Sequence, residues 1–312
     1  MKSTLYVGLL LLMTFTSGLS FIGYLGNVHW IFDLFVHFKL QYLVILSLGI
    51  IGLILLKKNK LYVIFLLPIF TNACDVGSLY IGRNRDGSTL DTMKICSVNV
   101  LSSNHKSHRL ASFIQRESPD ILIIQELTPL WQLSLQKIIA NYPYRREIPR
   151  NDNFGIALYS KRPFESLRTL TIGTAGFPSI LGEISTNNGA LTIIATHPPP
   201  PIGGEFTAAR NSQLSEIARI TAIGSENYAV FGDLNTSSYS THFKALLNDG
   251  KLFDSRKGYG VQTTWPTWFP LASTALDHCL TTENVVIKSR KVGENVGSDH
   301  LPIVVELGIK KE

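Results

Sequence analysis

The chain has 312 residues, a net charge of +6 and 45% hydrophobic residues, so it can bury a large core. Its three cysteines (Cys74, Cys96 and Cys279) cannot all pair and match no metal-ligand spacing, which excludes a disulfide framework and a cysteine-bound metal. The positive charges flank apolar segments or are scattered, so they fit a surface near anionic lipid headgroups as well as they fit nucleic acid.

The first part of the chain is strongly apolar. Three apolar segments at about 5–24, 40–56 and 61–81 predict three transmembrane helices, because a helix needs roughly 17–25 mostly apolar residues to cross a bilayer. The third segment reaches that length only if it continues through Asp75. A signal peptide over residues 1–20 followed by buried helices is the alternative, and the two further apolar runs disfavour it. We therefore expect residues 1–82 to form a transmembrane helical region.

The lysines near these segments predict the orientation. The cluster Lys57-Lys58-Asn59-Lys60 is the densest and favours the cytoplasm, which puts the loop carrying Lys39 outside. Three crossings would then place the rest of the chain outside the cytoplasm, on a multi-pass protein of the cell (inner) membrane. Arg83 and Arg85 argue for the opposite orientation.

Residues 92–312 are predicted to form a separate catalytic domain of the α+β class. Short β-rich runs alternate with a few helical patterns, and strand often follows strand, so two sheets packed face to face with helices outside are expected. The predicted strands are 93–100, 121–125, 155–159, 181–185, 191–196, 228–231, 275–281, 285–288 and 301–307. The predicted helices are 105–116, 129–139, 208–223 and 240–248.

Polar side chains stand where these apolar runs end. They are Asn99, Glu126, His197, the pair Asp233 and Asn235, Asp277, and the pair Asp299 and His300. A single Asn or His at a strand end is usually a turn residue or a satisfied core group. Six such positions in one domain are hard to explain in that way, because Asp is almost never buried without a partner. We therefore expect them to converge on one site.

The chemistry of these groups is consistent with one reaction class. Carboxylate and amide oxygens without cysteine suit a hard cation such as Mg²⁺ or Mn²⁺. Two histidines without a recognisable nucleophilic Ser or Cys point to water as the nucleophile. A metal, a water molecule and donors for an anion describe a phosphoester hydrolase.

Six motifs resemble those of the endonuclease/exonuclease/phosphatase (deoxyribonuclease I-like) superfamily, whose membrane-anchored bacterial branch is most similar. They are NV at 99–100, PDILIIQE at 119–126, TH at 196–197, GDLN at 232–235, LDH at 276–278 and GSDHLP at 297–302. Each is weak alone, but they occur in the family's order and span about residues 93–307. The resemblance implies a four-layer αββα sandwich with the site at one edge of the two sheets.

The resemblance also implies roles for these residues. Glu126 would be the principal metal ligand, with Asn99 beside it and Asp299 supporting the metal. Asp233 would orient or deprotonate the attacking water, and Asn235 would hold that water or the phosphate. His300 would contact the scissile phosphate with its tautomer fixed by Asp277, and His197 would stabilise the phosphate or the leaving oxygen. Whether Asp233 or the His300–Asp277 pair is the base stays open.

Several nearby residues are expected to have structural roles. Asn104 is interpreted as a helix N-cap rather than a ligand, and Arg210 as a member of a surface ion pair rather than a phosphate-binding residue. His105, His108 and His278 occupy no motif position. The aromatic segment 265–270 is expected either to pack in the core, to form a substrate wall or to form an interfacial aromatic patch. Specificity is expected in the loops 144–153, 198–206 and 262–273.

The substrate is not determined by these patterns. The first hypothesis is hydrolysis of lipid headgroups or small phosphoesters at the membrane, with the lipid bilayer and a phosphoester substrate as partners and no protein partner evident. The second is a nuclease that acts on DNA with the same site. The third is a catalytically inactive membrane-anchored binding protein, which the presence of Glu126, Asp233 and His300 disfavours.

Overall fold

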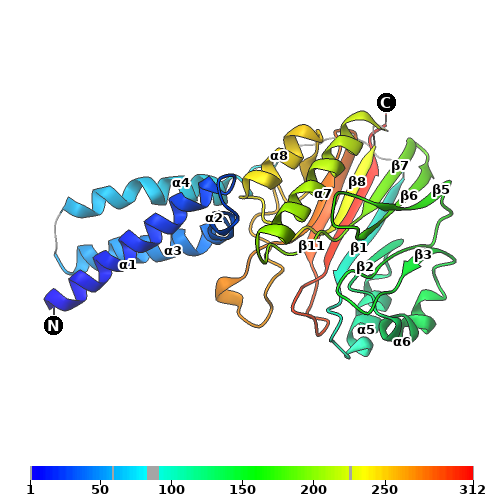
Figure 1. The fold of residues 1–312 in the computed structure, drawn as a ribbon, viewed down its shortest axis with the longest axis horizontal. Helices are drawn as coiled ribbons and strands as arrows, with labels where there is room; N and C mark the ends of the chain where they lie inside the picture. The colour runs from blue at the N-terminus through cyan, green and yellow to red at the C-terminus, as the bar shows by residue number, and fades with distance from the viewer. Residues whose placement is uncertain (1, 58–59, 83–90, 225–226, 312) are drawn as a thin grey trace.

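The computed structural model describes residues 2–57, 60–82, 91–224 and 227–311, arranged as an elongated helical region beside a larger domain (Figure 1). This larger domain is the one that the sequence predicts to be catalytic, and it is called the catalytic domain below. Lys58, Arg83 and Arg85, which entered the orientation argument, lie outside the described residues.

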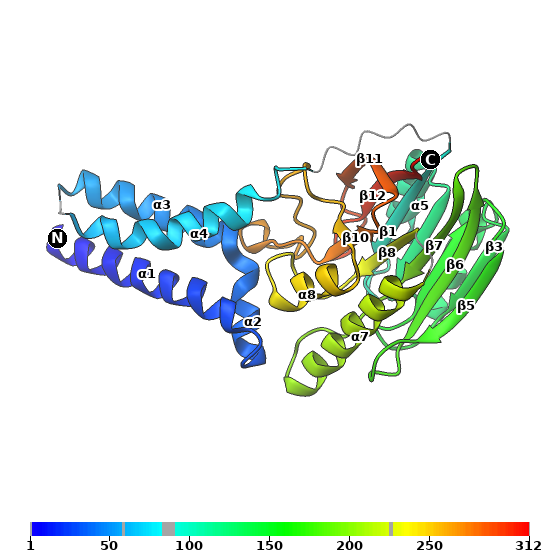
Figure 2. The same cartoon turned by 90° about the horizontal axis from the view of Figure 1, so that it is seen from above.

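The helical region contains three helices that lie side by side. Their bounds, with the short helices between them, are α1 Lys2–Ile22, η1 Gly23–Leu25, α2 Trp30–Phe35, η2 Val36–Phe38, α3 Lys39–Leu55, η3 Lys60–Phe65 and α4 Leu66–Gly77. Met13, Leu46, Leu53 and Phe65 form a small core between α1, α3 and α4. The short α2 lies at the end of this bundle that faces the catalytic domain (Figure 2).

Two helical stretches are long and apolar enough to cross a membrane, Ser3–Leu25 and Trp30–Leu55. The third apolar helix, Tyr62–Gly77, is shorter than a spanning helix. The expectation of three transmembrane helices is therefore not confirmed. The second stretch also begins earlier than the predicted segment 40–56, because α2 and η2 precede α3.

The catalytic domain has two six-stranded sheets. The first has the order β11-β12-β1-β2-β4-β3, and its strands are Val285–Val292, Ile303–Ile309, Thr92–Asn99, Ile121–Gln125, Ile156–Ser160 and Tyr144–Ile148. The second has the order β5-β6-β7-β8-β10-β9, and its strands are Ser166–Thr171, Pro178–Thr186, Gly189–Ala195, Tyr228–Asp233, Asp277–Thr281 and Phe253–Asp254.

The sheets pack face to face and helices cover their outer faces, which gives the expected sandwich. Aliphatic side chains from both sheets, such as Ile95, Ile123 and Phe231, fill the space between them. The helices α5 (Ser107–Glu117) and α6 (Pro129–Ile139) cover the first sheet, and α7 (Gly204–Ile223) and α8 (Thr241–Asp249) cover the second. Because both faces are covered, central strands such as β2 and β4 are buried at every residue.

The predicted elements match these helices and strands to within a few residues, but β3, β5 and the two-residue β9 were not predicted. The strands β3 and β5 lie at sheet edges and contain no buried residue, so their sequences lack the apolar runs by which strands were recognised. The interval 144–153, expected to be a loop, therefore begins with a strand.

The topology brings the motif residues to one edge of the sandwich. The strands β1 and β2 are parallel, so Asn99 and Glu126 leave the first sheet at the same end. The strands β7 and β8 are also parallel, so His197 and Asp233 leave the second sheet together. The antiparallel β10 begins directly opposite the end of β8, where Asp277 pairs with Asp233 in register.

Candidate active site

One pocket of about 1070 Å³ collects most of the predicted site residues. Its lining includes Glu126, His197, Asp233, Asn235, Asp299 and His300. The other two predicted residues, Asn99 and Asp277, are buried and hydrogen-bond to residues of this set. Side chains as far apart in the sequence as Asn99 and Asp233, which are 134 residues apart, are therefore in contact.

His300 lies between two carboxylates. Its Nδ1 is 2.8 Å from Asp277 Oδ2, and its Nε2 is 3.4 Å from Asp233 Oδ2. Burial alone would lower the pKa of this imidazole, but Asp277 and Asp233 outweigh burial and raise the pKa to about 10. His300 is therefore a cation at neutral pH, held in one orientation by Asp277.

Asp233 is the centre of the hydrogen-bond network. Its Oδ1 accepts from the backbone N–H of Asn235 at 2.9 Å, and its Oδ2 accepts from Asn99 Nδ2 at 3.2 Å. The Nε2 atom of His197 lies 3.6 Å from the same Oδ2. Burial would raise the pKa of Asp233, but His300, His197 and the backbone donor lower it to about 2. Burial lowers the pKa of His197, but the nearby Asp233 carboxylate outweighs burial, so this pKa lies above its ordinary value.

Glu126 is a buried carboxylate that no cationic side chain neutralises within the described part of the chain. Its Oε1 accepts from Asn99 Nδ2 at 3.0 Å and its Oε2 from the backbone N–H of Ser102 at 2.8 Å, both neutral donors. Its φ of 60° is the left-handed conformation that a non-glycine residue rarely adopts, and such strain is concentrated at functional sites. A buried carboxylate that lines a pocket and has no ion-pair partner among the described side chains fits a divalent metal ion.

The other two predicted metal residues have their oxygens engaged. Asn99 accepts the Leu101 N–H with its Oδ1 at 3.0 Å and turns its amide nitrogen to Glu126 and Asp233. Asp299 Oδ2 accepts from Trp265 Nε1 at 3.1 Å while the side chain still lines the pocket. Within the described residues, no group of three His, Cys, Asp or Glu side chains is arranged to hold a metal by itself. Glu126 and Asp299 could therefore contribute carboxylate oxygens to an ion whose remaining ligands would be water and substrate oxygens.

The GDLN turn needs its glycine. Gly232 has a φ of 152°, and a Cβ atom there would lie 1.8 Å from the carbonyl oxygen of Thr196 on the adjacent strand end. Because the backbone at Gly232 lies so close to Thr196, His197 and Asp233 lie side by side at the ends of β7 and β8. Asn235, at a φ of 49°, completes the turn and donates from Nδ2 to the Pro198 carbonyl at 3.0 Å.

The helical region supplies one side of the pocket, which the sequence did not predict. Trp30, Leu34, His37 and Phe38 all line the pocket together with the predicted site residues. The signal available in the sequence was the presence of Asp33 and His37 within an otherwise apolar stretch. Polar groups at such positions need partners in the protein, and here the catalytic domain provides them.

Arg210 is one of those partners, so its interpretation as a surface residue was wrong. Arg210 and Asp33 are both fully buried and form an ion pair at 2.7 Å. Asp33 also accepts from Ser240 Oγ at 2.7 Å, and Arg210 Nη1 donates to the backbone carbonyl of Asn235 at 3.1 Å. This ion pair therefore connects α2 to the turn that carries Asp233 and Asn235.

Two other residues have structural roles. The N-cap prediction for Asn104 was wrong, because α5 begins at Ser107 and Asn104 instead bonds to Lys106 N–H and the Val100 carbonyl. His278 is buried away from the pocket, with Nε2 at 2.8 Å from the Thr236 carbonyl. Burial is the main reason that its pKa falls to about 4.

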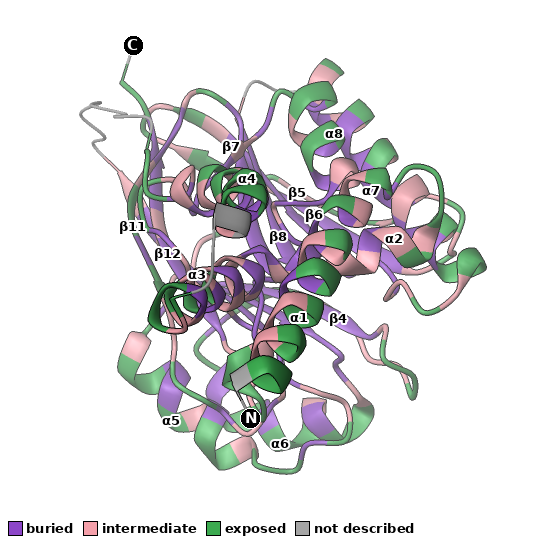
Figure 3. Cartoon of the chain, turned by 90° about the vertical axis from the view of Figure 1, so that its left-hand side faces the viewer, coloured by how far each residue is buried: buried purple, intermediate pink, exposed green. Residues whose placement is uncertain are grey.

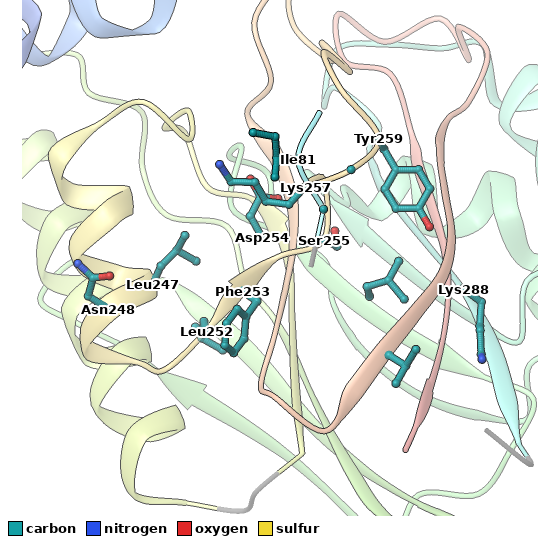
Figure 4. Close-up of a pocket in the computed structure, with 14 residues that line it drawn as sticks. Ile81, Leu247, Asn248, Leu252, Phe253, Asp254, Ser255, Lys257, Tyr259 and Lys288 are labelled. Carbon is teal, nitrogen blue, oxygen red and sulfur yellow. The ribbon is translucent and has the colours of Figure 1, made fainter. Parts of the chain in front are cut away.

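A second cavity of about 790 Å³ lies elsewhere, among Ile81, Phe253 and Tyr259 where the end of the helical region meets the second sheet (Figure 4). None of the motif residues lines it, so it is not the candidate site.

The fold and the site together define a two-sheet sandwich with a carboxylate–imidazole cluster at the edge of the sheets. The chain belongs to the Endonuclease/Exonuclease/phosphatase family, whose sequence profile matches residues 96–300. The matched range contains all eight predicted site residues. Members of this family are phosphoester hydrolases, and they typically use divalent metals.

Solved structures have the same fold. A family protein from Leptotrichia buccalis is 19% identical, with 70% of this chain and 100% of that chain covered and a TM-score of 0.58. The human Nocturnin catalytic domain is 18% identical, with 72% and 97% covered and a TM-score of 0.58. D. rerio TDP2 in complex with a single strand DNA product is 17% identical, with 70% and 99% covered and a TM-score of 0.57. No curated protein matches the chain by sequence.

Proposed function

We propose that this chain is a membrane-anchored, divalent-metal-dependent hydrolase that cleaves a phosphoester bond with an activated water. The observation that carries the proposal is that one pocket contains both Glu126 and His300. Glu126 is a buried carboxylate with only neutral hydrogen-bond donors, and the His300 imidazole lies between the Asp277 and Asp233 carboxylates. The first is suited to a metal ion and the second to a phosphate oxygen. An inactive binding protein has no need for this combination.

Glu126 and Asp299 would hold Mg²⁺ or Mn²⁺, and Asn99 would keep the Glu126 carboxylate in place through its amide. When bound, the ion would neutralise charge on the phosphate and favour attack by water. The strained backbone at Glu126 and the two neutral donors on its oxygens support this role, since they fix the carboxylate before the substrate arrives.

The protein's own groups would move the protons. At neutral pH Asp233 is ionised and His300 is a cation, so Asp233 is the better proton acceptor of the two. The water oxygen would bond to phosphorus while one of its protons passes to Asp233 and the ester P–O bond breaks. His300 would donate a hydrogen bond to a phosphate oxygen. A proton from His197 would reach the departing oxygen, and Asn235 would hold the water or the phosphate.

Membrane anchoring is the second part of the proposal. Only 17% and 28% of the residues in the two long apolar windows are buried, so these helices are not core helices of a globular domain. Large apolar side chains such as Leu11, Leu48 and Phe70 are more than 60% exposed on different helices of the bundle. Seen along the bundle, much of the outward surface of α1, α3 and α4 is exposed (Figure 3). An apolar surface of this extent suits lipid.

Polar contacts mark the end of the bundle nearest the catalytic domain. Tyr24 donates to Asp75 at 2.6 Å, and Lys39 lies 3.7 Å from the same carboxylate. Lys57 lies at the opposite end, where α3 ends. These positions favour a cell-membrane protein with its lysine-bearing turn in the cytoplasm and its catalytic domain outside.

Hydrolysis of bis-p-nitrophenyl phosphate by the purified full chain, with Mg²⁺ and then with EDTA, tests the chemistry. EDTA should abolish turnover and added Mg²⁺ should restore it. Replacing Glu126→Gln, which removes the charge and keeps the size, should lower kcat at least about a hundredfold. Glu216 is partly exposed on α7 and does not line the pocket, so Glu216→Gln is a matched control that should leave turnover unchanged. Turnover that persists in saturating EDTA would contradict the metal-dependent mechanism.

A further inference from the structure

The lining of the pocket has two chemically different parts. The charged and polar groups of the site, including Glu126, Asp233 and His300, form one part. The other part is apolar and combines Trp30, Leu34 and Phe38 of the helical region with Pro200, Ile202 and Phe206 of the catalytic domain. The same pocket therefore offers contacts for a phosphate and for a hydrocarbon group.

The charge of the pocket argues against a polyanionic substrate. None of the described residues that line it is a lysine or an arginine. Nucleic-acid affinity depends on such cations, which neutralise the backbone phosphates on either side of the cleaved bond. A polar substrate would also leave hydrogen-bonding groups unsatisfied against the apolar wall, whereas an apolar group gains free energy when it is buried there.

Further large apolar side chains are exposed on segments that also contribute residues to the pocket or adjoin those residues in the sequence. Val28 in the turn before α2 is 73% exposed, Ile202 in the proline loop is 68% exposed, and Leu271 in the 262–275 segment is 80% exposed. These three segments are far apart in sequence, yet the last one extends from the catalytic domain toward the helical region in both cartoon views (Figures 1 and 2). Exposed apolar residues beside a membrane helix fit the lipid–water interface.

We propose that the pocket binds a phosphoester of a membrane lipid, with the phosphate at the carboxylate–imidazole end and the hydrocarbon chain against α2. This assignment rests on the proposed hydrolase function and specifies its substrate class. In the reaction, the water oxygen bonds to phosphorus and the P–O bond to one ester group breaks. The products are a phosphomonoester and an alcohol, one of which keeps the hydrocarbon chain.

The test varies only the hydrocarbon chain. The full chain in detergent or in phosphatidylcholine vesicles is given methyl, hexyl or hexadecyl p-nitrophenyl phosphate with Mg²⁺, the hexadecyl ester being carried in the vesicles, and p-nitrophenolate release is followed. Each buried methylene should raise kcat/KM about fourfold, so three buried methylenes would favour the hexyl over the methyl ester about sixtyfold. The hexadecyl ester in vesicles should be turned over as well as the hexyl ester or better.

A matched pair of variants locates the effect. Leu34→Gln, which makes the pocket wall polar, should reduce the hexyl-to-methyl ratio of kcat/KM to below about tenfold. The same change at Leu48, which is 62% exposed on α3 outside the pocket, should leave the ratio unchanged. Because the wild-type ratio is measured without any substitution, a variant that fails to fold does not remove the test.

The outcomes separate the two proposals. A wild-type hexyl-to-methyl ratio within about threefold of unity, with both esters hydrolysed, would overturn the lipid assignment and leave the hydrolase intact. Faster turnover of a single-stranded oligodeoxynucleotide than of the hexyl ester would overturn it in favour of nucleic acid. If no ester is hydrolysed in the presence of metal, the hydrolase proposal fails, and the lipid assignment fails with it.

Discussion

The buried ion pair between Asp33 and Arg210 allows a quantitative test of how the helical region is joined to the catalytic domain. Both side chains are fully buried, and the guanidinium also bonds to the Asn235 carbonyl at 3.1 Å. Replacing Asp33→Asn keeps the size but leaves a buried cation without its counter-charge. Removing one partner of a buried pair typically costs about 3–5 kcal/mol, because the remaining charge is no longer compensated.

The expected change in thermal stability follows from this cost. For a domain of 150–250 residues, a loss of 1 kcal/mol lowers Tm by about 2–4 °C, so Asp33→Asn should lower Tm by roughly 6–20 °C. Arg210→Met, which leaves the carboxylate uncompensated, should have a similar effect. The double variant Asp33→Asn/Arg210→Met should be no less stable than the worse single variant, because no unpaired charge remains.

Tm of the full chain in detergent micelles, followed by tryptophan fluorescence, measures these effects. A matched control is the surface pair Glu216–Arg219 at 2.6 Å, where Glu216→Gln should leave Tm nearly unchanged because solvent screens the pair. The reasoning would be refuted if Asp33→Asn changed Tm no more than Glu216→Gln, or if the losses of the two single variants simply added. Because Arg210 holds the Asn235 carbonyl, both single variants should also lower kcat for bis-p-nitrophenyl phosphate, and a stability loss with unchanged kcat would show that the ion pair does not position the turn.

Three further predictions concern the site, acid stability and topology. His300→Ala and Asp277→Asn should each lower kcat at least about a hundredfold, and the double variant should be little worse than the worse single one; additive losses would show that Asp277 does not serve His300. Because burial holds the pKa of His278 at about 4, below its unfolded value, the native state binds fewer protons than the unfolded chain between about pH 6.5 and 4. Wild type should therefore lose about 3 kcal/mol more stability than His278→Gln as pH falls through that window, and equal pH profiles in chemical denaturation would contradict this. Alkaline phosphatase fused after Glu312 should be active and green fluorescent protein dark, since the catalytic domain is proposed to lie outside; the reverse pattern would overturn the topology and leave the enzyme proposal intact.

The sequence alone identified the family and most of the secondary structure, for a local physical reason. Apolar runs such as 121–125 and 228–231 are buried on both faces of their sheets. Each run can therefore be recognised as a buried strand from its own residues, without knowing which strands lie beside it. The polar residue that ends each run is equally visible, since a carboxylate after a buried strand needs a partner. The strands β3 and β5 were not found, because an exposed edge strand needs no continuous apolar run.

Only the tertiary structure decided how these pieces meet. The sequence gives no means of pairing Asp33 with Arg210, which are 177 residues apart, or of turning the Asn99 amide nitrogen toward Glu126 and Asp233. It also could not bring Trp30, Leu34 and Phe38 to the pocket, because their apolar character was equally consistent with a helix in lipid. Composition and periodicity report whether a side chain avoids water. Whether that side chain is buried against lipid or against another part of the protein depends on long-range packing. In this protein, long-range packing places α2 beside the predicted site residues.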